Sequence, residues 1–173
     1  MIRAKSMAAS MLVCCAVALS AETLPGTEGE NLLGQKVKVA DSLKGKIGVL
    51  VIGYSKASGD ITGAWEKRLS ADFGSNSAVA VYQMPMLEAA PKFIRGTIIS
   101  GMKKGIPAPK QANFIVVIKD EDEWKRVSVY QKGQDAYVVI VDRDGEVRQH
   151  SAVDSKLSSY DSVRHEIEKL INR

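Results

Sequence analysis

The stretch IGVLVIGYSKASGDITGAW, residues 47–65, decides the fold, because it leads from a buried strand into a helix. Residues 47–55 form a nearly continuous apolar run, which is typical of a strand buried on both faces of a sheet. Over residues 60–73, apolar side chains recur mostly at three- and four-residue steps, as on one face of a helix. We expect Asp60 to cap this helix.

Four further strands are expected downstream. Residues 77–86 and 113–119 are apolar runs, and Pro85 stops the first of them. Residues 136–150 contain two strands around the turn DRDG at 142–145, in which glycine supplies a positive φ. This turn predicts a β-hairpin near the end of the chain.

Three further helices are expected between and after these strands. Residues 90–105 predict a helix with Pro91 in its first turn. Its apolar side is formed by Phe93, Ile94, Ile98 and Met102. Residues 120–127 predict one or two helical turns anchored by Trp124, and residues 158–171 predict a closing amphipathic helix.

The chain has one domain in this interpretation. Residues 26–46 predict a short hairpin with turns at Gly34 and Gly45, ahead of the strand and helix of the opening stretch. The strands and helices then alternate, which places helices on both faces of a mixed sheet. No internal repeat or linker divides the sequence.

The first 21 residues have the pattern of a secretory signal peptide. Arg3 and Lys5 precede an uncharged apolar core, and small residues follow it. The core is too short to span a bilayer comfortably. We therefore expect removal of residues 1–21, a mature domain of residues 22–173, and a periplasmic or secreted protein. Retention of the segment as a membrane anchor is the alternative.

Both cysteines, Cys14 and Cys15, lie in this segment, so residues 22–173 contain no thiol. Small exported proteins often rely on disulfides, but this domain must fold on its core alone. Arg3 and Lys5 are two of the 24 basic residues, so residues 22–173 carry 22 basic and 20 acidic side chains. This near balance gives no reason to expect nucleic-acid binding.

One region of the sequence is distinctly basic. No acidic residue occurs between Glu88 and Asp120. The basic residues in this interval are Lys92, Arg95, Lys103, Lys104, Lys110 and Lys119. A solvated basic face is one interpretation, and a docking surface for an acidic partner or for anionic head groups is the other. The candidate docking residues are Lys92, Arg95, Lys103 and Lys104.

The order of these elements resembles the thioredoxin-like superfamily, including its peroxiredoxin and redoxin-type members. The resemblance rests on LKGKIGVLVIGYS at residues 43–55 and on VVIVDRDGEVR at residues 138–148, and it covers nearly all of residues 22–173. It implies an α/β, three-layer fold, in which a central mixed sheet carries helices on both faces.

Ser55 and Ser58 stand at the positions of the Cys-x-x-Cys pair in this resemblance. Apolar residues follow Ser58 at the offsets at which thioredoxins place them after their second cysteine. Ala136 stands where thioredoxins carry a cis-proline. The resemblance therefore implies a relic active site without disulfide exchange, since exchange requires a thiolate. A plain polar loop, with Ser58 or Asp60 as a helix cap, is the alternative.

A narrower resemblance is carried by FIRGTIISGMKKGIP, NFIVVI and GQDAYVVIVDRDGEVR. These segments are similar to the thioredoxin-like mitochondrial ATP synthase assembly-factor family and to related exported bacterial proteins, which also lack the redox pair. That family usually continues with an aromatic residue where Gln149 follows Arg148 here. The resemblance implies protein binding or assembly, a partner protein that could be membrane-associated, and no cofactor.

Other chemistries stay open at this point. The sequence GYSKA, residues 53–57, resembles a hydrolase nucleophile elbow, and Asp142 and His150 follow in the order of a triad. Met84, Met86 and His150 could bind copper. A metal carrier, a small-molecule carrier or a cysteine-independent enzyme is therefore the alternative to a binding module. We expect no calcium loop at residues 142–145, because further ligands are missing.

Overall fold

A computed structural model describes residues 22–131 and 134–173 of the chain. The expected signal peptide, with both cysteines, lies outside the described residues. Within the two described ranges, no helix has the length and apolar character that a membrane span requires.

The centre of the molecule is a four-stranded mixed sheet in the order β4-β3-β6-β7. Its strands are β3 (Ile47–Gly53), β4 (Val79–Pro85), β6 (Ala136–Val141) and β7 (Val147–Ala152). β3 is parallel to β4 and antiparallel to β6. Every residue of β3 and of β6 is buried, as the apolar runs predicted. Gly145 adopts φ +85° in the predicted hairpin turn between β6 and β7.

A smaller sheet in the order β2-β1-β5 packs beside the first. Its strands are β1 (Glu28–Asn31), β2 (Lys36–Lys38) and β5 (Ile115–Val116). The predicted N-terminal hairpin is confirmed, with Gly34 at φ +82°. The strand expected at 113–119 is wrong in length, because β5 has only two residues. The residues on either side of β5, Phe114 and Val117, pair with Gln83 and Met86 only through isolated bridges. A 3₁₀ helix, η1 (Ala108–Asn113), leads into β5.

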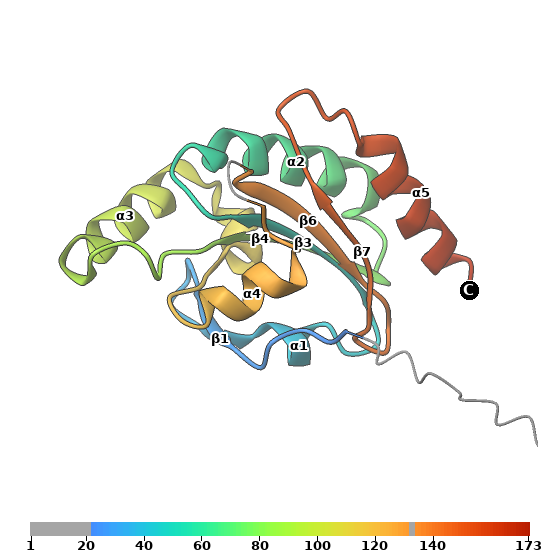
Figure 1. Ribbon diagram of the computed structural model, residues 1–173, viewed down its shortest axis with the longest axis horizontal. Coiled ribbons are helices and arrows are strands. Elements are labelled where there is room, and N and C mark those ends of the chain that lie inside the picture. Colours follow the sequence, from blue (N-terminus) through green and yellow to red (C-terminus); the bar gives the residue numbers. More distant parts are fainter. Residues whose placement is uncertain (1–21, 132–133) are drawn as a thin grey trace, which may run out of the picture.

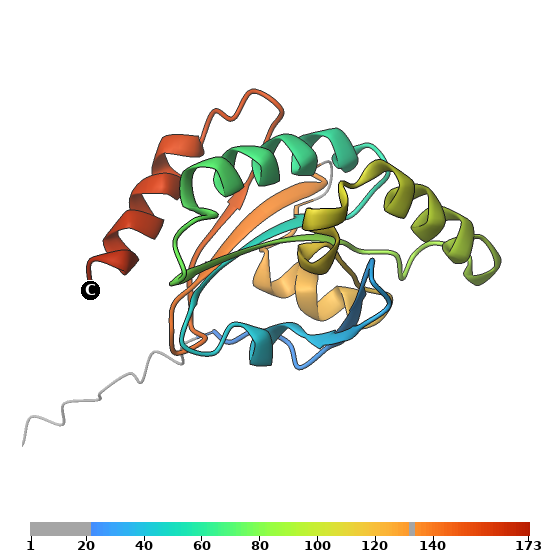
Figure 2. The same ribbon diagram turned by 180° about the vertical axis from the view of Figure 1, so that it is seen from behind.

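Helices cover both faces of the central sheet, which confirms the three-layer α/β architecture (Figures 1 and 2). On one face lie α2 (Ser58–Phe73) and α5 (Tyr160–Ile171), which pack Trp65, Leu69 and Ile167 against apolar side chains of β3 and β6. On the other face lie α1 (Val39–Ser42) and α4 (Glu121–Val127), with Trp124 fully buried. Two apolar cores therefore sandwich the sheet.

The helix α3 (Lys92–Gly105) lies at one end of the molecule, beside the sheet (Figure 1). Pro91 immediately precedes it, so the prediction that Pro91 lies in its first turn is wrong by one position. None of the residues of α3, all of which the structure describes, is buried. Its predicted apolar side is therefore only partly covered by the described residues: Met102 packs against the cluster of Leu32, Phe114 and Val116, whereas the Phe93 side chain is 87% exposed.

Candidate functional site

The turn between β3 and α2 is closed by its two serines. The backbone N–H of Ser58 donates to the carbonyl oxygen and to the Oγ of Ser55, at 3.2 Å each. The Ser58 hydroxyl donates to the Ser55 carbonyl oxygen at 2.7 Å. The helix α2 therefore begins at Ser58. The prediction that Asp60 caps this helix is wrong, because the serine turn already starts it two residues earlier.

The two serines differ in exposure. Ser58 is buried, whereas Ser55 is exposed at the surface. A Cβ atom at Gly53 would lie 2.6 Å from the Ser58 Oγ. Any larger residue at position 53 would therefore displace the Ser58 hydroxyl from its place in the turn.

Asp135, which immediately precedes β6, contacts the serine turn. Its carboxylate accepts a hydrogen bond from the Ser55 hydroxyl at 3.0 Å, and its carbonyl accepts one from the Tyr54 N–H at 2.8 Å. Ala136, next in the chain, pairs with Gly53 in the sheet and points into the core beside α2. Residues 22–131 and 134–173 contain no cis peptide bond. The sequence analysis identified Ala136 as a site residue and missed Asp135. Asp135 lies beside Ser55 only because β3 pairs with β6.

Buried polar side chains fix the first turn of α2. Gln83 of β4 donates from its Nε2 to the Thr62 Oγ1 at 3.0 Å, and Thr62 donates to the Gly59 carbonyl oxygen at 3.1 Å. Both side chains are buried, so the loss of one partner would leave the other without a hydrogen bond. This link holds the start of α2, and hence the serine turn, against the sheet.

Aromatic rings support the turn from the opposite face of the sheet. The Tyr54 ring lies 5.1 Å from that of Tyr130 and 5.8 Å from that of Tyr137, both edge-on. Its hydroxyl lies 2.9 Å from the Ser128 Oγ. Burial raises the pKa of Tyr54 above its ordinary range, so this phenol is neutral at physiological pH. The cluster holds the Tyr54 side chain in place beside the turn.

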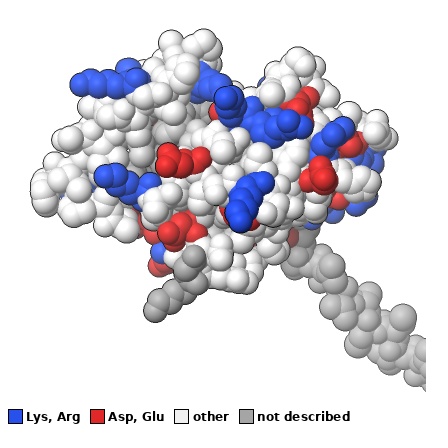
Figure 3. All heavy atoms as spheres, turned by 90° about the horizontal axis from the view of Figure 1, so that it is seen from above, with Lys and Arg blue, Asp and Glu red and all other residues white. Residues whose placement is uncertain are grey.

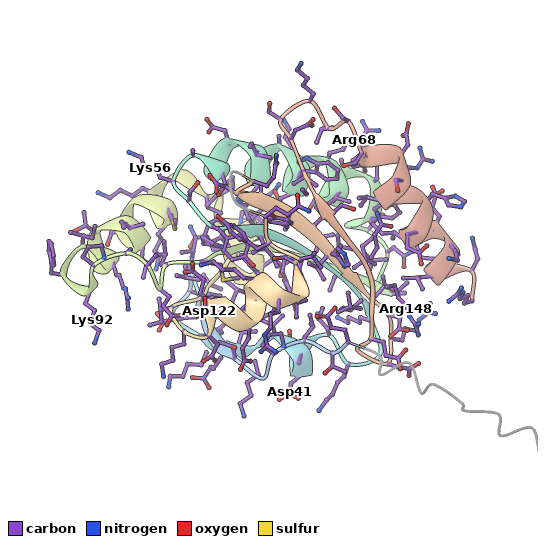
Figure 4. All side chains as sticks on the ribbon, in the orientation of Figure 1. Asp41, Lys56, Arg68, Lys92, Asp122 and Arg148 are labelled. Carbon is purple, nitrogen blue, oxygen red and sulfur yellow. The ribbon has the colours of Figure 1, made fainter. Side chains whose placement is uncertain are left out.

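A groove of about 710 Å³ separates the serine turn from α3. One wall is the turn itself, a second is the segment after β4, and the third is α3. The lining residues are Tyr54, Ser55, Lys56, Gly59, Met86, Leu87, Ala89, Ala90, Ile94, Thr97, Ile98, Gly101 and Met102. Among these described lining residues, none is acidic and Lys56 alone carries a charge. Figure 4 places Lys56 at the start of α2, on the side of the molecule where α3 lies.

The four candidate docking residues have different surroundings. Arg95 donates hydrogen bonds to the carbonyl oxygens of Ala90 and Glu88, at 2.8 and 2.6 Å, so it holds the segment before α3. Lys92, Lys103 and Lys104 are exposed on α3. In Figure 3 the left end of the molecule, where α3 lies, shows basic and uncharged atoms, and acidic atoms begin nearer the middle.

The hydrolase triad is not assembled. Ser55 follows the end of β3 that pairs with Ala136, whereas Asp142 follows the opposite end of β6. Asp142 accepts hydrogen bonds from the backbone N–H groups of Asp144 and Glu146, as a turn residue does. Lys56, beside Ser55, and Arg148, the ion-pair partner of Asp142, lie on opposite sides in Figure 4.

The copper ligands are not brought together either. Met84 and Met86 are buried in the core beneath α4, whereas His150 is exposed on β7. Across residues 22–131 and 134–173, no three His, Cys, Asp or Glu side chains gather where they could hold a metal ion.

Comparison with known proteins supports the fold. No protein-family model matches the chain, and no curated protein matches it. Solved structures do match. One is an exposed lipoprotein thioredoxin from Streptococcus pneumoniae, with a TM-score of 0.57 and 14% identity, covering 83% of this chain and 98% of that one.

Two other solved structures have the same architecture. A thioredoxin-family thiol:disulfide interchange protein from Chlorobium tepidum matches with a TM-score of 0.54 and 11% identity, over 87% of this chain and 96% of that one. BsSco, a member of the Sco family of cytochrome c oxidase assembly proteins, matches with a TM-score of 0.56 and 15% identity, over 86% and 93%. At these identities the likeness establishes the thioredoxin-like fold.

Proposed function

We propose that this protein is an exported, redox-inactive thioredoxin-like protein that binds another protein and assists its assembly. The observation that carries this proposal is the serine turn. It joins β3 to α2 in a thioredoxin-like fold, yet it holds hydroxyl groups instead of thiols. Serine neither ionises near neutral pH nor forms a disulfide, so the turn positions a surface and performs no thiol chemistry.

Two further observations support export and assembly. The sequence of residues 1–21 has the charge and apolar pattern of a signal peptide, and removal of this segment would take both cysteines with it. Among proteins of the same fold, one is named as an exposed lipoprotein and another as a member of a family of cytochrome c oxidase assembly proteins. The same two names include a thioredoxin and a disulfide switch, and this chain differs from such proteins in carrying serines at the turn.

The proposal is tested by crosslinking the protein in living cells and identifying the attached chain by mass spectrometry. We expect one partner to recur, attached near the serine turn or α3. The same purified protein should neither reduce insulin disulfides nor consume peroxide. Its N-terminus should lie near residue 21 or 22. Peptides that still carry Cys14 or Cys15 would contradict processed export, and thiol-type turnover would contradict redox inactivity.

A cysteine-independent enzyme would behave differently from a binding protein. An enzyme should lose its function when one polar side chain in the groove, such as Ser55, is changed to Ala. A binding protein should tolerate that change, because serine is rarely among the few residues that carry most of the binding energy of an interface. It should lose partner capture when apolar or basic residues of the binding surface are altered. Loss of function on Ser55→Ala alone, with the fold intact, would overturn the binding proposal.

A further inference from the structure

The side of α3 that faces the groove is only partly covered within the described protein. Ile99 and Met102 contact the small apolar cluster of Leu32, Phe114 and Val116, and so attach α3 to the body. Ile94 and Ile98 line the adjoining groove, and the exposed Phe93 precedes the lining residue Thr97 by four positions, on the same side of α3. Exposed apolar side chains that gather beside a concavity mark an interaction site rather than a scattered surface.

In the segment after β4, opposite α3, backbone N–H groups are already hydrogen-bonded within the protein. The Met86 N–H donates to the Gly53 carbonyl oxygen at 2.8 Å, and the Leu87 N–H donates to the Val117 carbonyl oxygen at 2.7 Å. An occupant would therefore not be held by adding a strand to this edge. It must contribute side chains that fill the apolar space, and a volume of about 710 Å³ lies within the range of known binding pockets.

The charges around the groove indicate which kind of ligand it would bind. Lys56 lies on one wall, and Lys104 follows Gly101 by three positions, on the same side of α3. The nearby Glu88 carboxylate already accepts the Glu121 N–H at 2.7 Å. Lys103 follows Ile99 by four positions and thus lies on another side of the helix. Two lysines therefore flank an apolar groove whose described lining contains no acid, and the Asp135 carboxylate, outside this lining, accepts the Ser55 hydroxyl at 3.0 Å.

We propose that this groove binds a peptide segment of the partner protein that combines large apolar side chains with acidic ones. The apolar side chains lie between α3 and the serine turn, and the acidic side chains face Lys56 and Lys104. This inference rests on the proposed function and gives that function its binding site. A flat anionic membrane would meet the lysines but would leave the space between the walls unfilled.

The first experiment selects ligands from a random library, so it does not require that the partner be identified. Random peptides displayed on phage are selected on the immobilised whole protein, after depletion on the Ile98→Asp variant. Circular dichroism first checks that this variant is folded. We expect the enriched peptides to combine Asp or Glu with Leu, Ile, Phe or Trp. Enrichment of peptides without acidic residues, or no enrichment at all, would overturn the inference.

The second experiment places the best selected peptide in the groove. Its affinity for Lys104→Glu and for Lys56→Glu should fall by at least about tenfold, because each change sets two like charges against one another. Lys103→Glu is the matched control, with the same charge change one position away, and its affinity should stay within about twofold. An equal loss for Lys103→Glu and Lys104→Glu would show general charge attraction and would refute a groove site.

The remaining outcomes separate this inference from the proposed function. If the protein binds anionic phospholipid vesicles through Phe93 and binds no peptide, the inference is overturned and the ligand of this surface is a membrane. A cellular partner that crosslinks equally well to the wild type, Ile98→Asp and Lys104→Glu would refute the groove but leave the binding function standing. Absence of any crosslinked partner would count against the function itself, whatever the selected peptides do.

Discussion

At the scale of single residues, the serine turn keeps a geometry that two sulfur atoms could share. The hydrogen bond from the Ser58 N–H to the Ser55 carbonyl closes a four-residue turn, and such turns hold their end Cα atoms within about 7 Å. A disulfide requires a Cα separation of about 4.4–6.8 Å. Ser55 is exposed and Ser58 is buried, so of two cysteines at these positions only the one at position 55 would be accessible to a thiol reagent.

We therefore predict that Ser55→Cys with Ser58→Cys oxidises in air to an intramolecular disulfide. The experiment uses a chain in which Cys14 and Cys15 are replaced by serine, and mass spectrometry of the digested protein detects the bridged peptide. Adding Asp135→Asn should lower the pKa of the thiol introduced at Ser55, because the Asp135 carboxylate contacts this position and opposes a thiolate. Two thiols that stay reduced would identify the turn as a plain polar loop.

Asp142 is a second residue whose surroundings have measurable consequences. Burial by itself would raise the pKa of this carboxyl, but hydrogen bonds from the Glu146 N–H and from Arg148 outweigh it, and the pKa is lowered. The folded pKa then lies below the unfolded value of about 3.9. The resulting stabilisation is complete above that value and is lost as the pH falls through the folded pKa.

We predict that Asp142→Asn lowers the free energy of unfolding at pH 7 by about 1.5–3 kcal/mol, as the loss of hydrogen bonds to a charged group does. The variant should also lose less stability than the wild type between pH 4 and the acid limit (about pH 2). Urea unfolding at several pH values measures both effects. Asp122→Asn is the control, because this side chain is fully exposed and its removal should matter by less than about 0.5 kcal/mol. Parallel acid curves for wild type and Asp142→Asn would contradict the assignment.

At the scale of the elements, α5 and α3 show how similar patterns lead to different burial. α5 and the loop before it are held against α2, since Trp65 donates to the carbonyl of Asp154 in that loop at 2.8 Å and Tyr160 of α5 donates to the Asp72 carboxylate at 2.7 Å. Burial, helped by the bond to Asp72, raises the pKa of Tyr160 to about 12. Every residue of α3, by contrast, keeps part of its surface exposed to solvent.

We predict that the same substitution has unequal effects on the two helices. Ile167→Ala in α5 removes a fully buried side chain and should cost about 2–5 kcal/mol. Ile94→Ala in α3 removes a side chain that is 36% exposed and should cost less than about 1 kcal/mol. Chemical denaturation of both variants measures the difference. A large cost for Ile94→Ala would mean that the groove side of α3 is covered in solution.

At the scale of the whole molecule, stability is distributed unevenly. The strands β3 and β6 are buried along their whole length between the two cores, whereas α3 is attached through one side only. Local opening requires little free energy where few apolar contacts must break.

Hydrogen-exchange rates should therefore differ between the central strands and α3. We predict that the amides of β3 and β6 exchange only through global unfolding, and that those of α3 exchange by local opening at least about tenfold faster. Exchange followed by mass spectrometry resolves the corresponding peptides. Addition of a groove-binding peptide should slow exchange in α3 and leave β3 unchanged. Equal protection of α3 and β3 in the free protein would show that α3 belongs to the same cooperative unit.

The sequence by itself determined most strands and helices, because their signals are local. The apolar run of residues 47–55 predicted β3, and the periodicity after it predicted α2 except for its first two residues. The hairpin around Gly145 and the helix α5 followed from equally local patterns. The order of these elements also indicated the three-layer sheet, because alternating strands and helices allow few arrangements.

Only the tertiary structure decided what these elements present to one another. The position of Asp135 beside Ser55 depends on the pairing of strands about 80 residues apart, which no local pattern encodes. The length of β5 depends on how many of its residues pair with β1, and beyond these residues the segment makes only isolated bridges. The partly exposed apolar side of α3 also depends on tertiary structure. An apolar stripe predicts that a helix face will be buried, but not whether the chain itself supplies the covering surface.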